Sequence, residues 1–442
     1  MRKRRLIPLA LGAVATAVAL LVSLAVSPAA AATARFSKPV ALPQSADFGE
    51  PSLAVDPTGL IYVTAPQKLG NVTGTGSPVW VSTNGGRSFG AAVNPDGDPI
   101  SGGDTDIITD SAGNVYQTDL WLGNTAMAVS TDHGQSFIAN EWGHLQAGDD
   151  RPWFGYSPSD QSMYLAWDGL DGIHVARADL GTPAGAYGAL TFPQDVIAVP
   201  ECAVNADPCA TPPIRQCVCP PGGIAVDPNT GEVFVSYSRQ NGGSLGGGVG
   251  IAYSTDQGLT WTESNVPGTG STGSAFDTEW NFDPIHVDSL GNVYVTWGEM
   301  NPGGVSIKLA TSKDHGVTWS RPFTVSTNTG TNVFPAMDVV KPGVVDVSYY
   351  GTPTSGDPNH VNATWSLYFA QVSNALAAPR TTPVVAVPSI HTGCIQAGGT
   401  ADCPDRSLLD FFQLVVSGGK AKIIYTAGDA ANGTQLYFVK QT

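Results

Sequence analysis

Short runs of alternating apolar and polar residues recur along the chain, and turn residues separate them. One kind of run follows an Asp and a turn that contains Gly, as in residues 56–65 (DPTGLIYVTA) and 288–297 (DSLGNVYVTW). Alternation with a period of two predicts β-strands, and a Gly turn in front of such a run predicts a hairpin. The same phrase occurs at 110–119 and 227–237, so the pattern indicates a hairpin unit that is built several times.

A second phrase lies downstream of each hairpin and ends in an aromatic residue. Its copies are VSTNGGRSF (81–89), VSTDHGQSF (129–137), YSTDQGLTW (253–261) and TSKDHGVTW (311–319). Each copy follows another strand-like run, so the unit consists of about four short strands. We expect the acidic or amide side chain to accept backbone N–H groups and the Gly to take a positive φ. We expect His133 and His315, which lie in these turns, to be solvated.

Three further units are less regular and lack the tight turn, at 151–181, 334–373 and 408–441. Together with the four regular units they predict an all-β fold, a single β-propeller of seven four-stranded blades, with six blades as the alternative. The last unit ends at Thr442 without a fourth strand. Residues 35–42 (RFSKPVAL) resemble 319–326 (WSRPFTVS), so we predict that an N-terminal strand completes the last blade and closes the ring.

The first 34 residues differ from the rest of the chain. Arg2 to Arg5 are basic, Leu6 to Val26 form an uncharged apolar run, and small residues follow. This order predicts a signal peptide over 1–34, with an uncleaved membrane anchor as the alternative, and a secreted domain over 35–442.

Charge and cysteine content narrow the choice of partners and compartment. The formal net charge of −16 argues against nucleic acid and anionic membranes as partners. Six cysteines fit an oxidising compartment, and Cys394 and Cys403 are close enough in sequence to pair. Two disulfides or a zinc site could use the remaining four, whose connectivity stays open: Cys202, Cys209, Cys217 and Cys219.

The four tight turns resemble the Asp-box, S-x-D-x-G-x-T-W, of the bacterial neuraminidase repeat. This resemblance implies a sialidase-like propeller and a carbohydrate-active protein that hydrolyses or binds an anionic glycan. An exo-sialidase also needs three Arg on the substrate carboxylate, a Tyr–Glu nucleophile pair and an acid/base Asp. The chain departs from that family because it has no Arg-Ile-Pro motif and has seven predicted units instead of six blades.

Charged residues concentrate where the innermost strand of each unit is predicted to begin. An Arg there can bind a carboxylate in a bidentate pair, a Trp can stack on a sugar, and a carboxyl group can act as acid or base. The substrate-binding candidates are Arg151, Trp153, Arg215, Trp280, Arg406 and Asp410. The catalytic candidates are Asp104, Asp106, Asp150, Glu279 and Asp283. The alternative for the arginines is that Arg–Asp pairs simply close the channel.

Three functions compete on this evidence. The first is an exo-sialidase-type glycoside hydrolase, which predicts that Arg151, Arg215 and Arg406 converge in one pocket. The second is a non-catalytic propeller that binds glycan, protein or cell wall, which predicts that the charged groups pair with one another. The third is a uronate polysaccharide lyase. We expect a monomer and no cofactor, with Ca²⁺ near Glu279, Asp283 and His286 as the alternative to a catalytic role for those residues.

Overall fold

The structure is a computed structural model of the chain. It describes residues 34–66, 76–95, 102–121, 124–144, 149–180, 190, 192–200, 218–239, 248–269, 282–397 and 403–442. The signal-peptide prediction and the prediction for Cys202, Cys209 and Cys217 lie outside these residues, as does the side chain of Cys219. Within the described residues there is no helix with the length and apolarity that crossing a membrane requires.

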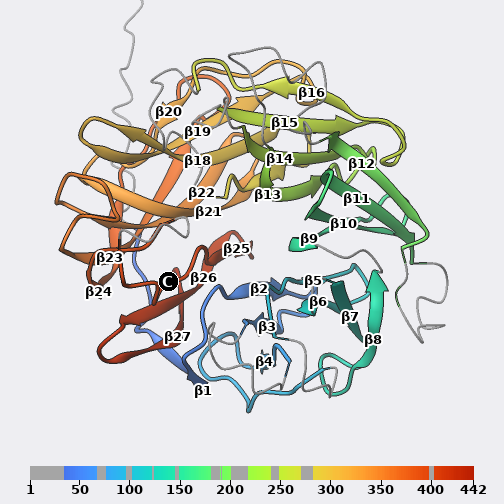
Figure 1. The fold of residues 1–442 in the computed structure, drawn as a ribbon, viewed down its shortest axis with the longest axis horizontal. Coiled ribbons are helices and arrows are strands. Elements are labelled where there is room, and N and C mark those ends of the chain that lie inside the picture. The colour runs from blue at the N-terminus through green and yellow to red at the C-terminus, as the bar shows by residue number, and fades with distance from the viewer. Residues whose placement is uncertain are drawn as a thin grey trace, which may run out of the picture. The chain divides into compact units, whose positions relative to one another are not determined.

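The described residues form seven antiparallel sheets in a ring, which we number as blades 1 to 7 (Figure 1). Blade 1 has three strands, β2 (Ser52–Val55), β3 (Ile61–Thr64) and β4 (Val79–Ser82), and a bridge from Val79 to Val93 extends it. Blade 2 contains β5 (Ile107–Thr109), β6 (Val115–Trp121), β7 (Asn124–Ser130) and β8 (Ile138–His144). Blade 3 contains β9 (Asp150–Ser157), β10 (Ser162–Gly169), β11 (Gly172–Asp179) and β12 (Gln194–Pro200).

The other four blades each have four strands. Blade 4 contains β13 (Val218–Val226), β14 (Val233–Arg239), β15 (Val249–Ser254) and β16 (Thr262–Asn265). Blade 5 contains β17 (Ile285–Val287), β18 (Val293–Asn301), β19 (Gly304–Ser312) and β20 (Phe323–Thr324). Blade 6 contains β21 (Thr331–Lys341), β22 (Val344–Thr352), β23 (Ala363–Ser373) and β24 (Val384–Gly393). Blade 7 contains β25 (Gln413–Ser417), β26 (Lys420–Asp429), β27 (Gly433–Lys440) and β1 (Val40–Ala46).

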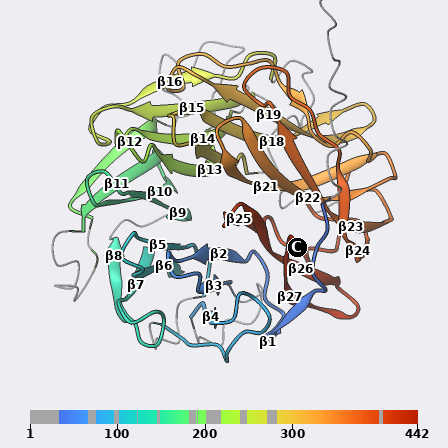
Figure 2. The ribbon, with the colours of Figure 1, turned by 180° about the vertical axis from the view of Figure 1, so that it is seen from behind.

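Both ends of the described chain contribute to blade 7. Its strand order is β1-β27-β26-β25, and Val40 pairs with Phe438. The N–H of Ser37 also donates to the carbonyl of Lys440 at 2.9 Å. The predicted closure by an N-terminal strand is therefore confirmed, and so is the prediction of seven blades. Figure 2 shows β1 beside β27 from the opposite side.

Buried hydrophobic residues form seven clusters, and each cluster joins two neighbouring blades. The cluster around Trp80, for example, combines blade 1 residues with Phe438 of blade 7. Because every blade packs on both sides, no sheet face of the ring needs a covering helix. This packing places the innermost strands, β2, β5, β9, β13, β17, β21 and β25, next to one another around the centre.

The four repeated turns have the expected internal hydrogen bonds. In the turn after β7, Asp132 accepts the N–H and the hydroxyl of Ser136 at 2.9 and 2.6 Å, and the N–H of Gly134 donates to Ser130 Oγ. These bonds to the ionised carboxylate lower the pKa of Asp132 to about 2. Gly134 has a φ of 77°, as the sequence predicts. The turn is therefore a structural element of each regular blade.

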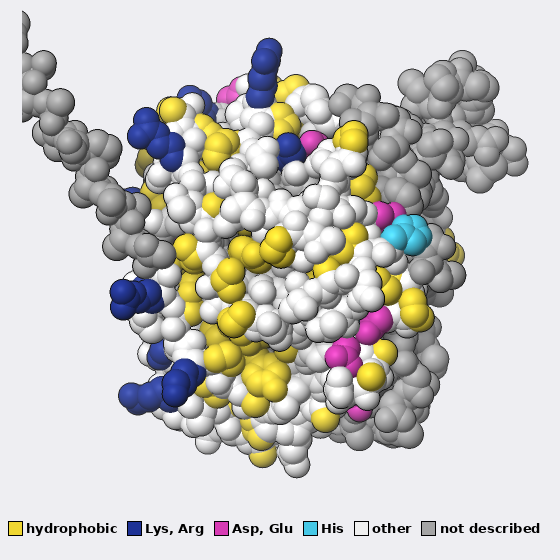
Figure 3. Space-filling model, turned by 90° about the vertical axis from the view of Figure 1, so that its left-hand side faces the viewer, with side chains coloured by type: hydrophobic (Ala, Val, Ile, Leu, Met, Phe, Trp, Pro, Cys, Tyr) yellow, Lys and Arg dark blue, Asp and Glu magenta, His cyan; other side chains and the backbone are white. Residues whose placement is uncertain are grey.

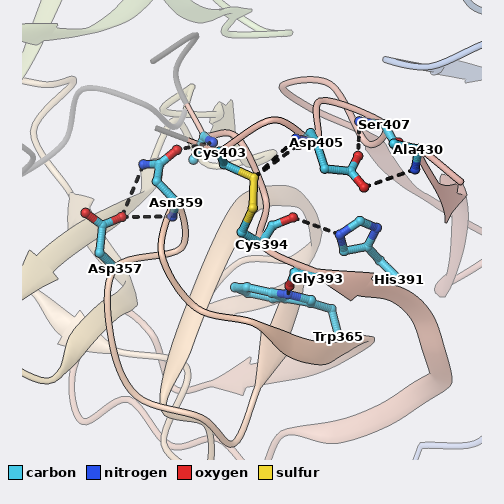
Figure 4. The surroundings of a disulfide bond; sticks show 11 residues. Asp357, Asn359, Trp365, His391, Gly393, Cys394, Cys403, Asp405, Ser407 and Ala430 are labelled. Carbon is cyan, nitrogen blue, oxygen red and sulfur yellow. Dashed lines mark hydrogen bonds between the residues drawn. A yellow bond between two sulfur atoms is a disulfide. The ribbon is translucent and has the colours of Figure 1, made fainter. Parts of the chain in front are cut away.

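The predicted disulfide between Cys394 and Cys403 is present, with 6.0 Å between the Cα atoms (Figure 4). Cys394 follows β24, and its carbonyl lies 2.9 Å from His391 Nε2. Cys403 lies two residues before Asp405, whose carboxylate accepts the N–H groups of Ser407 and Ala430. The disulfide therefore fastens the segment that leads to Arg406 and Asp410 onto the outer part of blade 6.

Figure 3 shows the face of the ring on the side of β23 and β24. Hydrophobic side chains gather over its middle, with Lys and Arg at one margin and Asp and Glu near the other. A groove of about 630 Å³ separates β24 from blade 7 on the outside of the ring, and Pro388, Tyr425 and Tyr437 contribute to its walls.

Candidate functional site

Arg151, at the start of β9, lies at the centre of a group of ion pairs. Its Nη1 lies 3.1 Å from Glu50 Oε1, its Nε 3.2 Å from Asp104 Oδ2, and its Nη2 2.7 Å from Asp410 Oδ2. Glu50 precedes β2, Asp104 precedes β5 and Asp410 precedes β25. One guanidinium therefore connects blade 3 with blades 1, 2 and 7 on the face where the innermost strands begin.

Arg406 supplies a second guanidinium to the same group. Its Nη2 lies 2.6 Å from Asp410 Oδ2, the oxygen that Arg151 also contacts. The backbone N–H of Asp410 donates to Glu50 Oε1 at 3.1 Å. We call Glu50, Asp104, Asp150, Arg151, Arg406 and Asp410 the Arg151 cluster. Since four of its members are acids and two are bases, the cluster is acidic overall when all are ionised.

The backbone around the cluster adopts an uncommon conformation. Arg151 and Glu50 have φ values of 55° and 48°, and Leu409, next to Asp410, has 56°. Non-glycine residues rarely occupy this left-handed region, and they remain there only where surrounding contacts hold them. The ion pairs of the cluster and the hydrogen bond from Asp410 to Glu50 are such contacts.

Burial and charge shift the proton affinities in the cluster. Burial raises the pKa of Glu50 well above its usual range, although Arg151 opposes the shift. Burial lowers the pKa of Arg151, but the charges of Glu50, Asp104, Asp410 and Asp150 outweigh this and raise it. Burial, the charge of Asp104 and a hydrogen bond with Asp104 raise the pKa of Asp150 to about 6. The Asp150 side chain is 50% exposed, so this carboxyl group can reach a ligand.

Three aromatic rings, those of Trp153, Phe282 and Phe411, lie next to the cluster. Phe282, just before β17, contacts Trp153 and Phe411 with ring centroids 5.7 Å apart in both pairs, and Trp153 contacts Phe411 at 4.9 Å. The guanidinium carbon of Arg151 lies 4.8 Å from the centre of the Phe282 ring, a cation–π distance. Trp153 is only 8% exposed, and its indole N–H donates to the carbonyl of Pro221.

These rings and the innermost strands of all the blades line a cavity of about 380 Å³. Most of its lining is apolar, with Asp106, His286, Asp338 and Gln413 as the main polar side chains. His286 Nδ1 lies 3.3 Å from Asp338 Oδ1, so these two groups pair with each other. The cavity and the Arg151 cluster together make up the central region in which propeller ligands are usually sought.

Two of the predicted catalytic residues are buried. Asp106 accepts hydrogen bonds from Ser52 Oγ at 2.6 Å and from the N–H of Phe154 at 2.9 Å, and burial raises its pKa. Asp283 accepts a hydrogen bond from Ser238 Oγ at 3.0 Å, its Oδ1 has no partner, and burial raises its pKa well above the usual range. Both carboxyl groups join strands of neighbouring blades and are almost inaccessible to solvent.

The structure thus brings Asp104, Asp150, Arg151, Arg406 and Asp410 together, with Trp153 beside them. Arg215, Glu279 and Trp280 lie outside the described residues, so the predicted three-arginine site and the Ca²⁺ alternative remain predictions. Sequence reasoning did not find Glu50, Phe282 or Phe411. Glu50 lies just before an innermost strand, as the other candidates do. Its position before β2 could therefore have identified it from the sequence.

Comparisons with known proteins give the fold alone. No family model and no curated protein match this chain. A Dyadobacter fermentans protein of unknown function is similar in structure at 12% identity, with a TM-score of 0.50, over 92% of this chain and 98% of that one. An intramolecular trans-sialidase from Ruminococcus gnavus (12% identity, TM-score 0.42, 89% and 94%) and a Penicillium chrysogenum α-L-arabinanase (12%, 0.45, 71% and 92%) are more distant.

Proposed function

We propose that this protein is an exported glycan-binding propeller whose Arg151 cluster recognises a neutral glycan without hydrolysing it. One observation carries the proposal. The three nitrogens of Arg151 contact carboxylates of the protein itself, and its side chain is 12% exposed. A ligand carboxylate would have to displace Glu50, Asp104 or Asp410 and leave a buried charge unpaired, which is strongly unfavourable.

The accessible groups of the cluster suit sugar hydroxyls. Asp150 is half exposed, and Asp104 and Arg406 are partly exposed. An ionised carboxylate accepts hydrogen bonds and a guanidinium donates them. Because a sugar hydroxyl can both donate and accept, it can bind to either group. The net acidic character of the cluster repels sialic acid and uronates, which are the anionic ligands that the sequence resemblance implies.

Binding is proposed over hydrolysis because the carboxyl groups of Glu50, Asp104 and Asp410 are already paired with the guanidinium of Arg151. Export is proposed from the residue pattern of positions 1–34 and from the Cys394–Cys403 disulfide, which persists in oxidising compartments.

The test is binding of the purified mature protein to an array of neutral, sialylated and uronate oligosaccharides, followed by calorimetry on the best ligand. We expect neutral glycans to bind and Asp150→Asn to weaken binding about tenfold or more, since a hydrogen bond to a charged group is lost. The matched control is Asp179→Asn, whose exposed carboxylate pairs with Arg177 on blade 3. Preferential binding of sialylated or uronate glycans would overturn the proposal, as would turnover of an aryl sialoside that disappears in Arg406→Ala.

A further inference from the structure

A second group of polar side chains lies between blades 4 and 5. Asp227 directly follows β13, Glu232 precedes β14, and His315 lies in the tight turn after β19. One ligand atom from each of these residues lies within 4.8 Å of the other two. Successive strands of a blade run antiparallel, so these turns lie on the face of the ring opposite to the Arg151 cluster. The group is therefore separate from the candidate functional site.

His315 is exposed, as the sequence predicts, and its Nδ1 also lies 2.6 Å from Glu232 Oε2 of the neighbouring blade. Asp227 is 1% exposed, and its Oδ1 accepts the N–H groups of Asn229 and Thr230. No hydrogen bond from a described residue reaches Asp227 Oδ2. This oxygen lies beside Gly291, where an added methyl group would stand 2.8 Å from it and 3.1 Å from His315 Cε1.

The other regular blades show how the equivalent carboxylate is normally satisfied. In blades 1, 2 and 5 a Tyr hydroxyl donates to Oδ2 of the turn Asp, at 3.0 Å from Tyr62 to Asp56, 2.9 Å from Tyr116 to Asp110 and 2.6 Å from Tyr294 to Asp288. In blade 4 the residue at this position is Phe234, which pairs with Ala225 as Tyr62 pairs with Ala54. Phe234 has no hydroxyl, so blade 4 alone among these four blades lacks the hydrogen bond from an aromatic hydroxyl to Oδ2.

Blade 4 also supplies an additional ligand. Glu232 directly precedes β14, whereas the residue directly before β3 in blade 1 is Leu60. The counterpart of this group at blade 1 is the contact of His133 Nδ1 with Asp56 Oδ2, at 3.3 Å. It has one imidazole and one carboxylate, and the hydroxyl of Tyr62 already donates a hydrogen bond to that carboxylate oxygen. Between blades 4 and 5 there are an imidazole and two carboxylates, and Oδ2 of the more buried one, Asp227, accepts no hydroxyl hydrogen bond from the residue at position 234.

We propose that Asp227, Glu232 and His315 form a binding site for a divalent transition-metal ion of the zinc type. One imidazole nitrogen and two carboxylate oxygens are ligands that Zn²⁺ accepts in tetrahedral geometry, and an imidazole selects such ions over Ca²⁺ and Mg²⁺. Metal–ligand bonds of about 2.0–2.2 Å place tetrahedral ligand atoms about 3.4 Å apart. The present spacing, up to 4.8 Å, thus needs movements of about 1 Å or less.

The bound ion would take the place of the hydrogen bond between His315 Nδ1 and Glu232 Oε2. Because the ion binds a neutral imidazole, binding weakens at pH values at which histidine is protonated. Three protein ligands leave the fourth tetrahedral position to water. Because the ligands come from two blades, the ion would also join blade 4 to blade 5 and stabilise the folded ring.

The experiment measures Zn²⁺ binding to metal-stripped, tag-free mature protein by equilibrium dialysis and atomic absorption. Glu232→Gln and His315→Asn each remove a ligand, so each is expected to bind one equivalent of Zn²⁺ less than the wild type. The difference from the wild type is compared, because any Zn²⁺ bound by the Cys-rich stretch would be the same in all variants. Phe234→Tyr restores the hydroxyl found in the other blades and is expected to weaken the site about three- to tenfold without removing a ligand. His133→Asn, in the blade 1 counterpart, is the matched control and should leave binding unchanged.

Thermal melting gives an independent measurement. Zn²⁺ at saturating concentration should raise the Tm of the wild type and of His133→Asn, but not that of Glu232→Gln, because only a ligand that binds the folded state stabilises it. Equal stoichiometry and affinity in the wild type, Glu232→Gln and Phe234→Tyr would overturn the proposal. Phe234→Tyr keeps every ligand, and Tyr is the residue at the equivalent position of blades 1, 2 and 5. This variant should therefore fold, and it tests the proposal even if His315→Asn does not fold.

Discussion

Arg151 Nη2 lies 2.7 Å from Asp410 Oδ2, although 259 residues separate the two in sequence. This contact joins blade 3 to blade 7. The same guanidinium also contacts Glu50 of blade 1 and Asp104 of blade 2, the two blades that lie between blades 3 and 7. Arg151 therefore connects blade 7, which the two ends of the described chain share, with blades 1, 2 and 3.

Arg151→Gln should destabilise the protein by about 3–5 kcal/mol, because Glu50 and Asp410 would remain buried without their partner. Urea unfolding of the mature protein measures the change. The loss should be smaller at pH 5 than at pH 8, since unpaired carboxylates can then take up protons. Arg321→Gln, at an exposed position, should change stability by less than about 0.5 kcal/mol. Equal effects of the two substitutions would show that the ion pairs do not stabilise the ring.

Asp346→Asn should stabilise the protein at alkaline pH. Asp346 is fully buried, its Oδ2 has no partner, and burial raises its pKa to about 7. An unfolded Asp ionises near pH 4, so folding stability falls as the pH rises from about 4 through 7. The Asn side chain remains neutral and keeps the hydrogen bond from Gln371.

The expected gain is about 2–4 kcal/mol at pH 8.5 and close to zero at pH 4. Urea unfolding at both pH values gives the comparison, with Asp179→Asn at the exposed end of β11 as the control. A gain of the same size at both pH values would mean that the ionisation of Asp346 is not its cause.

Replacement of both disulfide cysteines, Cys394→Ser with Cys403→Ser, should lower stability by about 2–3 kcal/mol, since the disulfide closes a short loop with a sequence separation of 9. The substitution should also weaken glycan binding, because the segment it fastens carries Arg406 and Asp410. Unfolding curves and calorimetry on the same samples separate the two effects. Unchanged affinity in a destabilised variant would show that the disulfide does not position the cluster.

Gly222→Ala should be destabilising, because a methyl group at this position would lie 2.3 Å from the backbone nitrogen of Asp283. Overpacking of this kind costs about 1–3 kcal/mol. Gly223→Ala is the matched control on the same strand, since its nearest contact would be an ordinary 3.6 Å. Thermal melts of the two variants give the comparison, and a Tm for Gly222→Ala as high as that for Gly223→Ala would contradict the expected crowding between blades 4 and 5.

The architecture was predictable because it rests on local patterns. The tight turns repeat the same hydrogen bonds wherever their residues recur, and the likeness of residues 35–42 to another outer strand identified the closing strand. Cys394 and Cys403 paired as their proximity suggested. In each case the signal and the structure involve residues close in sequence or copies of one unit.

The partners of the charged groups were not predictable in the same way. Glu50 contacts Arg151 across 101 residues, and Glu232 contacts His315 across 83. No spacing rule relates such pairs, because the ring geometry alone decides which turns of neighbouring blades face each other. Phe282 and Phe411 are also far apart in sequence, which explains why their aromatic contact was not predicted.

The sharing of blade 7 between both ends of the chain also determines an order of assembly. Blades 1 to 6 are each built from consecutive residues and can form as soon as those residues are present. The strand that contains Val40 must wait for Phe438, so the earliest described strand is the last to find its partner. Until then the edge of β27 and the hydrophobic surface around Trp80 are uncovered. Pairing of β1 with β27 is therefore the last step in the assembly of the ring.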